Sequence, residues 1–380
     1  MKWRVRVSNE AGEIKKIAIA AVSSRPFVCE AAAAGYQVLA LDTFADADTQ
    51  RAAHQSCRVQ YSQGHFDAAD FERILNSLEF NGYAGLAYGS GFEAAPELLE
   101  LAAQYLPLIG NTPLVLRNMK RPRQFFMLLD GLQIPHPQVS FRPLDKAAGW
   151  LYKQGGGSGG THVRKALPLP SIAPERGCYF QREVRGVPVS LLFAADGKQI
   201  RVIGFNRQWL APSAAMPYRY GGAVSQANLP EPVRQQLIHA AQQLTNAVGL
   251  RGFNSLDAIM DGDQVWVLEI NPRLSATFDL YQSDACNLFD LHLRACAGDI
   301  SDWPLVSARA KAHQIVYAPS DLVLSDAMNW PAWAADLPLP GSHILANNPI
   351  CTVCARGESA EAAQALVLAR AKALEDIIKK

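Results

Sequence analysis

Four polar side chains within residues 252–273 are spaced in a way that predicts a site for a metal ion and phosphate groups. Two apolar runs flank residues 261–264, Asp-Gly-Asp-Gln, which is a strong signal for a β-hairpin. A hairpin that turns about Asp263 places Asp257 directly opposite Glu269. Two carboxylates are therefore expected to face each other across neighbouring strands.

The second strand of this hairpin adds further polar groups. Because side chains alternate along a strand, Glu269, Asn271 and Arg273 are expected on one face. Carboxylate and amide oxygens suit Mg²⁺ (or Mn²⁺) bound together with substrate phosphates, and arginine suits a transferring phosphoryl group or an acyl phosphate. An ordinary hairpin with solvated carboxylates is the alternative, but apolar neighbours bracket Glu269 and make an unpaired charge costly. Asp257, Glu269 and Asn271 are therefore predicted metal ligands.

A second candidate is the loop at residues 155–160, which has five glycines in six positions. Glycine-rich loops lose much entropy on ordering, so they usually serve where a side chain would block a close approach. The backbone N–H groups around Gly156, Gly157 and Gly159 can form a concavity for phosphate oxygens. Lys153, at the end of the preceding strand, adds a positive charge.

Three kinds of phosphate-binding loop compete for this segment. A Walker A loop requires Lys and Ser or Thr before a helix, and the sequence after Gly160 does not supply them. The GxGxxG pattern is formally present, but the proline-rich segment 164–174 cannot begin a helix. We interpret the loop as a flap over a nucleoside triphosphate, with an exposed hairpin tip that binds nothing as the alternative.

The elements that position these segments alternate at first between strand and helix patterns. Apolar runs at 16–22, 36–41 and 83–88 read as strands, and helices are expected at 26–34 and 95–106. Repeated βα units predict an α/β domain with a parallel sheet covered by helices. The region after about residue 135 is mostly strand-like, a helix is expected at about 231–248, and a smaller α+β module ends the chain.

The loop after the first strand reads Ser23-Ser24-Arg25-Pro26. A dinucleotide site needs glycines there so that the backbone can approach a pyrophosphate, and none is present. Binding of NAD at this place is therefore disfavoured.

The composition sets the broad class. The chain has 380 residues with 36 Lys+Arg against 35 Asp+Glu, and 49% of its residues are hydrophobic, which predicts two or three packed domains. A net charge of +1 gives no electrostatic reason to expect nucleic acid or membrane partners. No apolar run reaches the roughly 18 residues of a membrane helix, and the charged first residues do not resemble a signal peptide. The seven cysteines are an odd number, and five of them are scattered without ligand-like spacing, which suits the cytoplasm. Cys351 and Cys354 form a CxxC, but no second pair or nearby histidines complete a zinc site, so they are read as small buried side chains.

Together, these residues resemble the ATP-grasp superfamily of carboxylate-amine ligases. Lys153 with its loop is similar to the family's lysine and glycine flap, and Asp257, Glu269, Asn271 and Arg273 match its acidic, acidic, Asn and Arg pattern. The resemblance implies a Rossmann-like pre-ATP-grasp domain at 1–115, an ATP-grasp domain of two lobes at 116–300 and a C-terminal module at 301–380. It also implies ATP and Mg²⁺ as cofactors.

The resemblance further implies where ATP is held. The adenine pocket would use Gln181, Arg182, Glu183 and Val184, while the family's ribose-binding acid would fall near Pro188, which cannot play that part. The family's first ATP lysine corresponds either to Lys120 or to Arg123. Lys153 and Arg273 would be the catalytic residues.

The implied activity is ATP-dependent ligation of a small-molecule carboxylate to an amine through an acyl phosphate. Residues 42–49, 336–341 and 349–353 look like a branch of predicted carboligases that includes tyramine-glutamate ligase, a step towards methanofuran-type cofactors. The alternatives are another ATP-grasp reaction, a carboxylase or a phosphotransferase, or a nucleotide-binding protein without catalysis. Whether the chain forms a homodimer is left open.

Overall fold

The protein is represented by a computed structural model that describes residues 15–166, 174–175, 177–282, 286–301, 309–325 and 328–378. The expectations for the first residues and for most of the proline-rich segment fall on residues 1–14 and 167–173, outside the described part. Among the described residues, no helix is both long enough and apolar enough to cross a membrane.

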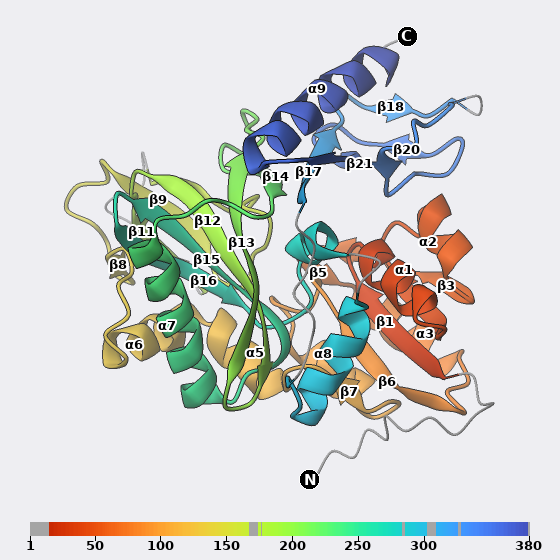
Figure 1. The fold of residues 1–380 in the computed structure, drawn as a ribbon, viewed down its shortest axis with the longest axis horizontal. Coiled ribbons are helices and arrows are strands. Elements are labelled where there is room, and N and C mark those ends of the chain that lie inside the picture. The colour runs from red at the N-terminus through yellow and green to blue at the C-terminus, as the bar shows by residue number, and fades with distance from the viewer. Residues whose placement is uncertain are drawn as a thin grey trace.

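The N-terminal part is a parallel five-stranded sheet with helices on both sides, at the lower right of Figure 1. The sheet has the order β3-β2-β1-β6-β7, and every neighbouring pair is parallel. Its central strands are almost fully buried, as apolar runs covered on both faces must be. The elements are β1 (Lys16–Ala21), α1 (Arg25–Ala33), β2 (Gln37–Asp42), α2 (Ala47–Ala52), β3 (Gln55–Arg58), β4 (Tyr61–Ser62), β5 (His65–Phe66), α3 (Ala68–Asn76), β6 (Tyr83–Tyr88), α4 (Glu97–Ala102) and β7 (Leu108–Ile109).

Two short helices lead from this sheet into a small four-stranded sheet of order β10-β9-β11-β8. This sheet carries the glycine-rich loop between β9 and β10. The elements are α5 (Pro113–Lys120), α6 (Pro122–Gly131), β8 (Val139–Ser140), β9 (Trp150–Gln154), β10 (Arg164–Lys165) and β11 (Cys178–Arg182).

The third unit is an antiparallel eight-stranded sheet of order β16-β15-β12-β13-β14-β17-β21-β19. Helix α7 packs against β12, β13, β15 and β16, and α9 packs against β14, β17 and β21 (Figure 1). The principal elements are β12 (Val187–Asp196), β13 (Ile200–Leu210), β14 (Tyr220–Val224), α7 (Glu231–Val248), β15 (Arg251–Asp261), β16 (Gln264–Asn271), the 3₁₀ helix η1 (Ala276–Tyr281), α8 (Leu288–Ala297), β17 (Ala310–Tyr317), β18 (Leu322–Val323), β19 (Ala334–Ala335), β20 (His343–Ile344), β21 (Pro349–Gly357) and α9 (Ala360–Ile378).

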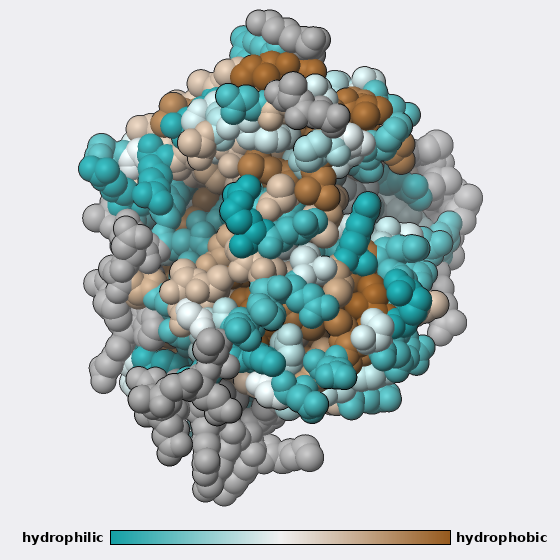
Figure 2. Space-filling model, turned by 90° about the vertical axis from the view of Figure 1, so that its right-hand side faces the viewer, coloured by the Kyte–Doolittle hydropathy of each residue, from teal (hydrophilic) through white to brown (hydrophobic). Residues whose placement is uncertain are grey.

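The C-terminal segment extends this large sheet, because β14 pairs with β17 across the division predicted near residue 300. The segment also lies over the N-terminal sheet, and Figure 2 shows hydrophobic surface on the face where the two parts meet. Val323, Leu339 and Leu345 are among the exposed hydrophobic residues of the segment. The division into domains at residues 115 and 300 stays a prediction.

Most predicted elements are present with shifted ends. The helix expected at 231–248 is α7. Asp67 caps α3 by accepting a hydrogen bond from the Asp70 N–H. The helix expected at 95–106 is wrong in length, since α4 spans only Glu97–Ala102. Its flanking residues form turns instead.

The N-terminal sheet is joined to the rest of the molecule through the buried side chain of Asn111. Its Nδ2 lies 2.9 Å from Asn254 Oδ1 and 3.0 Å from the Pro272 carbonyl oxygen, while its Oδ1 accepts from the Arg251 N–H at 2.9 Å. The Tyr88 hydroxyl donates to the Asn111 carbonyl oxygen. One amide side chain therefore satisfies buried polar groups of two parts of the chain.

We predict that Asn111→Ala lowers the free energy of unfolding by about 3 kcal/mol, because it leaves buried donors and acceptors unpaired. Urea denaturation at neutral pH measures the change. The exposed Asn228, replaced by alanine in the same way, should cost less than about 0.5 kcal/mol. Equal effects of the two substitutions would contradict the role given to Asn111.

Candidate active site

The candidate site is built on the hairpin β15–β16, and the predicted pairing is confirmed: Asp257 and Glu269 are direct partners. The route to that pairing differs from the prediction. Near the turn Asp261 pairs with Gln264, which centres the turn half a residue before Asp263. A register shift after Asp257 then places Asp257 opposite Glu269, as expected. The bulge is thus what brings the two carboxylates opposite each other.

The side chains around this pair form one connected network. Asn271 Nδ2 donates to Asp257 Oδ2 at 2.9 Å, and Lys120 Nζ donates to Asn271 Oδ1 at 2.6 Å and to Glu269 Oε2 at 3.2 Å. Gln208 Nε2 lies 3.4 Å from Asp257 Oδ1. Lys120, at the end of α5, is therefore the basic residue that reaches the carboxylates.

The two carboxylates respond in opposite directions to this environment. Desolvation and the nearby Glu269 raise the pKa of Asp257. Desolvation acts in the same sense on Glu269, but Lys120 and Lys153 outweigh it and hold the pKa of Glu269 below its ordinary value. The site thus has two facing acids that repel each other, which is a place where an added cation would be stabilised.

Arg273 lies beyond the second strand rather than on it, because β16 ends at Asn271 and Pro272 follows. The expected face is nevertheless kept, since Arg273 Nη2 lies 3.3 Å from Asn271 Oδ1. Its Nε donates to Glu93 Oε1 at 2.7 Å, and both side chains are buried, with exposed fractions of 8% and 1%. Burial raises the pKa of Glu93, but Arg273 and Lys120 together hold it below its ordinary value.

Lys153 and Gln181 face the hairpin from the small sheet. Lys153 Nζ donates to Gln181 Oε1 at 3.1 Å, whereas Gln181 Nε2 is buried without a hydrogen-bond partner among the described residues. Burial lowers the pKa of Lys153, and the charges of Glu269 and Asp257 oppose that shift. A buried amide donor that lacks a partner in the described residues and lies beside a lysine fits a site that binds polar atoms of a ligand.

The glycine-rich loop packs closely on its neighbours. Gly156 has φ +76°, and a Cβ there would lie 2.8 Å from the Glu93 carbonyl oxygen. A Cβ on Gly157 would overlap the His162 ring, whereas one on Gly159 would meet nothing within 4 Å. At two of the three predicted positions, the need for glycine therefore comes from close contact.

His162 follows this loop, and its buried Nδ1 atom has no hydrogen-bond partner in the described part of the chain. Burial and the charge of Lys153 lower the pKa of His162 to about 4, so the ring is neutral at pH 7. A neutral ring can accept or donate a hydrogen bond towards the space shared with Lys153.

The remaining predicted ATP-binding residues lie in different places. Arg123 is exposed, with its guanidinium 4.4 Å from the centre of the Phe141 ring, and it does not join the Lys120 network.

Arg182 Nη1 donates to the Ala148 carbonyl oxygen. Glu183 accepts from Lys165 Nζ at 2.6 Å and from the Tyr218 hydroxyl at 2.7 Å, and Val184 is half-buried after the strand. The side chains of Arg182 and Glu183 are thus engaged with protein groups, which leaves backbone atoms of this hinge for an adenine ring.

Metal binding at the hairpin depends on ligands beyond the protein. The described residues contain no group of three or more His, Cys, Asp or Glu side chains arranged to hold a metal ion. Asp257, Glu269 and the amide oxygen of Asn271 fit a hard cation such as Mg²⁺ that takes its other ligands from phosphates and water. Because Lys120 now contacts the oxygen of Asn271, that lysine would have to shift when a metal ion binds there.

Sequence reasoning missed Glu93, Gln208 and His162 as members of the site. Glu93 follows the turn Gly89-Ser90-Gly91 at the end of β6, where open α/β sheets bind ligands, so its position carried a signal. Its ion pair with Arg273 spans 180 residues of chain, and no local pattern indicates such a partner. Gln208 and His162 lie in an ordinary strand and an ordinary loop end.

The comparisons with known proteins bear on the fold of the chain. Residues 123–277 match the family model described as an ATP-grasp domain. Its mixed α/β architecture is the ATP-grasp fold, as predicted. A search of the curated proteins found no match.

Solved structures share the fold over nearly the whole chain at low sequence identity. An L-amino acid ligase from Bacillus licheniformis is 16% identical with a TM-score of 0.70, over 96% of this chain and 98% of that one. A phosphoribosylamine–glycine ligase from Thermotoga maritima is 13% identical with a TM-score of 0.66, over 94% and 96%. A biotin carboxylase from Campylobacter jejuni, solved as a β,γ-ATP complex, is 13% identical with a TM-score of 0.67, over 93% and 90%.

We predict that Glu93→Gln destabilises the protein by about 3 kcal/mol at pH 7, because it leaves the buried charge of Arg273 unpaired. The pKa of Glu93 is lowered by folding, so its contribution is present above the unfolded pKa of about 4.3 and is lost as the pH falls below it. The difference in unfolding free energy between wild type and variant should therefore shrink between pH 6 and pH 3.5. Urea titrations across that range measure it, and a difference that stays constant would argue against the ion pair.

Proposed function

We propose that the protein is an ATP-dependent ligase that joins a small-molecule carboxylate to an amine through an acyl phosphate. The carrying observation is the convergence of two facing carboxylates and Asn271 with Lys120, next to the buried Arg273. This is the set of charges that phosphoryl transfer requires, because that reaction is chiefly positioning and charge neutralisation. The ATP-grasp domain at residues 123–277 supports the proposal.

Each group has a definite part in this proposal. Mg²⁺, or Mn²⁺, would neutralise the charge of the ATP phosphates when bound by Asp257, Glu269 and Asn271. Lys120 and Lys153 would contact phosphate oxygens, and the loop with Gly156, Gly157 and Gly159 would cover them. The adenine would lie against the hinge that includes Gln181, Arg182, Glu183 and Val184, with Arg123 as a more distant cation.

The reaction then proceeds in two steps that need no protein nucleophile. A carboxylate oxygen of the acid substrate attacks the γ-phosphorus of ATP and releases ADP, which leaves an acyl phosphate. An amine attacks the acyl carbon, phosphate leaves, and the nitrogen loses a proton to give the amide. Arg273 would stabilise the negative charge of the acyl phosphate.

Glutamate and tyramine are the first substrates to test. The support is the likeness of residues 42–49 and 336–341 to the carboligase branch that includes tyramine-glutamate ligase. The described residues of both stretches border the interface between the N-terminal sheet and the C-terminal segment, where Asp48 accepts hydrogen bonds from the N–H groups of Asp336 and Leu337. A panel of other acids and amines follows in the same ADP-release assay, together with bicarbonate for a carboxylase reaction.

We predict that Glu269→Gln lowers ADP release at least about 100-fold, because the substitution removes a metal-binding charge beside the phosphates. The assay compares wild type and variant at saturating MgATP with the most active acid and amine, and circular dichroism checks the fold. Asp263→Asn is the matched control, since this exposed carboxylate lies in the turn of the same hairpin and should leave turnover unchanged. Near-normal ADP release by the Glu269 variant would contradict the assignment of Glu269 as a metal-binding residue.

The glycine-rich loop gives a second test. Gly156→Ala and Gly157→Ala should each weaken MgATP binding by about tenfold, since a side chain at either position displaces the loop from its contacts with Glu93 or His162. Isothermal calorimetry with MgATP measures the affinity. Gly131→Ala serves as the control because a Cβ there meets nothing within 4 Å. Unchanged affinity in both loop variants would show that the loop takes no part in nucleotide binding.

A further inference from the structure

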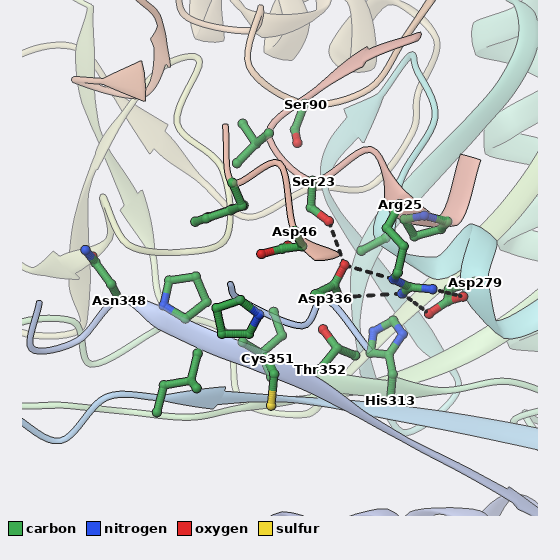
Figure 3. Close-up of a pocket in the computed structure, with 18 of the residues that line it drawn as sticks. Ser23, Arg25, Asp46, Ser90, Asp279, His313, Asp336, Asn348, Cys351 and Thr352 are labelled. Atoms are coloured by element: carbon green, nitrogen blue, oxygen red, sulfur yellow. Dashed lines mark hydrogen bonds and ion pairs between the residues drawn. The ribbon is translucent and has the colours of Figure 1, made fainter. Parts of the chain in front are cut away.

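A pocket of about 550 Å³ lies between the N-terminal sheet and the C-terminal segment. One wall consists of residues that follow the carboxyl ends of β1, β2 and β6, among them Ser23, Asp46 and Ser90 (Figure 3). The other wall comes from η1, β17 and the region of β21. Sheets of this topology bind ligands at the carboxyl ends of their strands. The volume suits a small molecule.

Arg273 connects this pocket to the proposed ATP site. Its side chain lines the pocket and also lies 3.3 Å from Asn271 Oδ1. A molecule in the pocket therefore shares a wall with the place where the acyl phosphate would form.

The cations that line the pocket are nearly all neutralised by protein groups. Arg25 Nη2 donates to Asp279 at 2.9 Å and its Nε donates to Asp336 at 2.9 Å, as the dashed lines in Figure 3 show. Arg273 is paired with Glu93. Arg58 also lines the pocket, but it is solvent-exposed.

Asp46 is the exception among the pocket's acids. Only 6% of its surface is exposed, yet its carboxylate has no hydrogen bond or ion pair with any described residue, and no dashed line reaches it in Figure 3. It sits at the N-cap of α2, where an aspartate normally accepts a hydrogen bond from the helix backbone, but it makes no such bond. The carboxylate therefore serves neither the helix nor a salt bridge.

A buried carboxylate without a cationic partner is costly. Burial raises the pKa of Asp46 to about 8, with further increases from Asp336, Asp42 and Asp48 and an opposing effect of Arg25. The neighbouring acids have partners: Asp42 accepts from Ser24 and from the backbone of Phe44, and Asp336 is held by Arg25. A cationic group placed beside Asp46 would remove this cost.

We propose that the pocket binds a small substrate that carries a protonated amino group, and that Asp46 pairs with its ammonium group. The apolar side chains of Phe44, Leu339, Ile344 and Ile350 line the same pocket and would cover the hydrocarbon part of the molecule. This inference rests on the proposed ligase function, in which either the amine substrate or an amino acid serving as the acid substrate would carry such a group.

Calorimetry with two matched pairs of probes tests the proposal and separates these two sources. Isoamylamine is compared with isoamyl alcohol, and leucine is compared with its 2-hydroxy analogue. We expect at least one ammonium compound to bind wild type tenfold or more tighter than its hydroxyl counterpart. Binding of isoamylamine identifies the amine substrate as the source, and binding of leucine alone identifies an amino acid.

Asp46→Asn should reduce the preference for the ammonium compound over its hydroxyl counterpart to twofold or less, and Asp46→Ala serves as a second variant. Asp263→Asn is the control that should retain the preference. At pH 7, the ammonium compound should also release close to one proton from wild type, measured in two buffers of different ionisation enthalpy, because Asp46 must ionise to pair with it. The Asp46 variants should release none. A purely structural aspartate would give no such proton release.

Several results would overturn the proposal. They are equal binding of ammonium and hydroxyl probes, no binding of either, a preference that survives in both Asp46 variants, or Asp46-dependent binding of Mg²⁺ or Ca²⁺ alone. MgATP affinity, measured on the same samples, keeps the two hypotheses apart. If the protein binds the ammonium probe but not MgATP, the ligase function is refuted and the pocket proposal stands. If it binds MgATP but not the ammonium probe, only the pocket proposal is refuted.

Discussion

The buried ion pair between Arg273 and Glu93 is the interaction on which the arrangement of the site depends. Two buried charges are tolerated only when each has its partner, so the end of the hairpin and the end of β6 are held in one relative position. Glu93 is itself fixed by the N–H groups of Gly91 and Phe92. The pair thus orients Arg273 between Asn271 and the neighbouring pocket.

Electrostatics across the site are balanced locally rather than by the chain as a whole. The formal net charge of +1 supplies no general attraction for a polyanionic nucleotide. Lys120 of α5 and Lys153 of β9 instead lower the pKa of Glu269. The two facing acids repel each other, which a bound metal ion would relieve, and the two lysines would balance the charge of phosphates.

The continuous eight-stranded sheet has a consequence for substrate choice. Because β17 and β21 belong to the same sheet as the hairpin, the C-terminal segment is carried over the N-terminal sheet and forms one wall of the pocket. The segment contributes Asp336, which pairs with Arg25 of α1 across that interface. Residues from both ends of the chain therefore shape the space beside Arg273.

Local sequence was sufficient to predict a large share of the molecule. The hairpin, the glycine-rich loop and most helices follow from alternation, turn residues and capping, all of which act over a few neighbouring residues. The bulge that produces the register was not predictable, because it depends on how β15 and β16 pack within the large sheet. The length of α4 was also missed, since tertiary packing overrides helix propensity at its ends.

The tertiary structure decided which distant charges meet. The sequence did not decide whether Lys120 or Arg123 corresponds to the family's first ATP lysine. Only the packing of α5 against β16 brings Lys120 to Glu269 and Asn271. Likewise, Glu93 gains Arg273, and Asp46 gains no partner among the described residues, because of where loops from separate strands end. Sequence alone determined the chemical groups and their local spacing, whereas burial and long-range pairing depend on chain segments that only folding brings together.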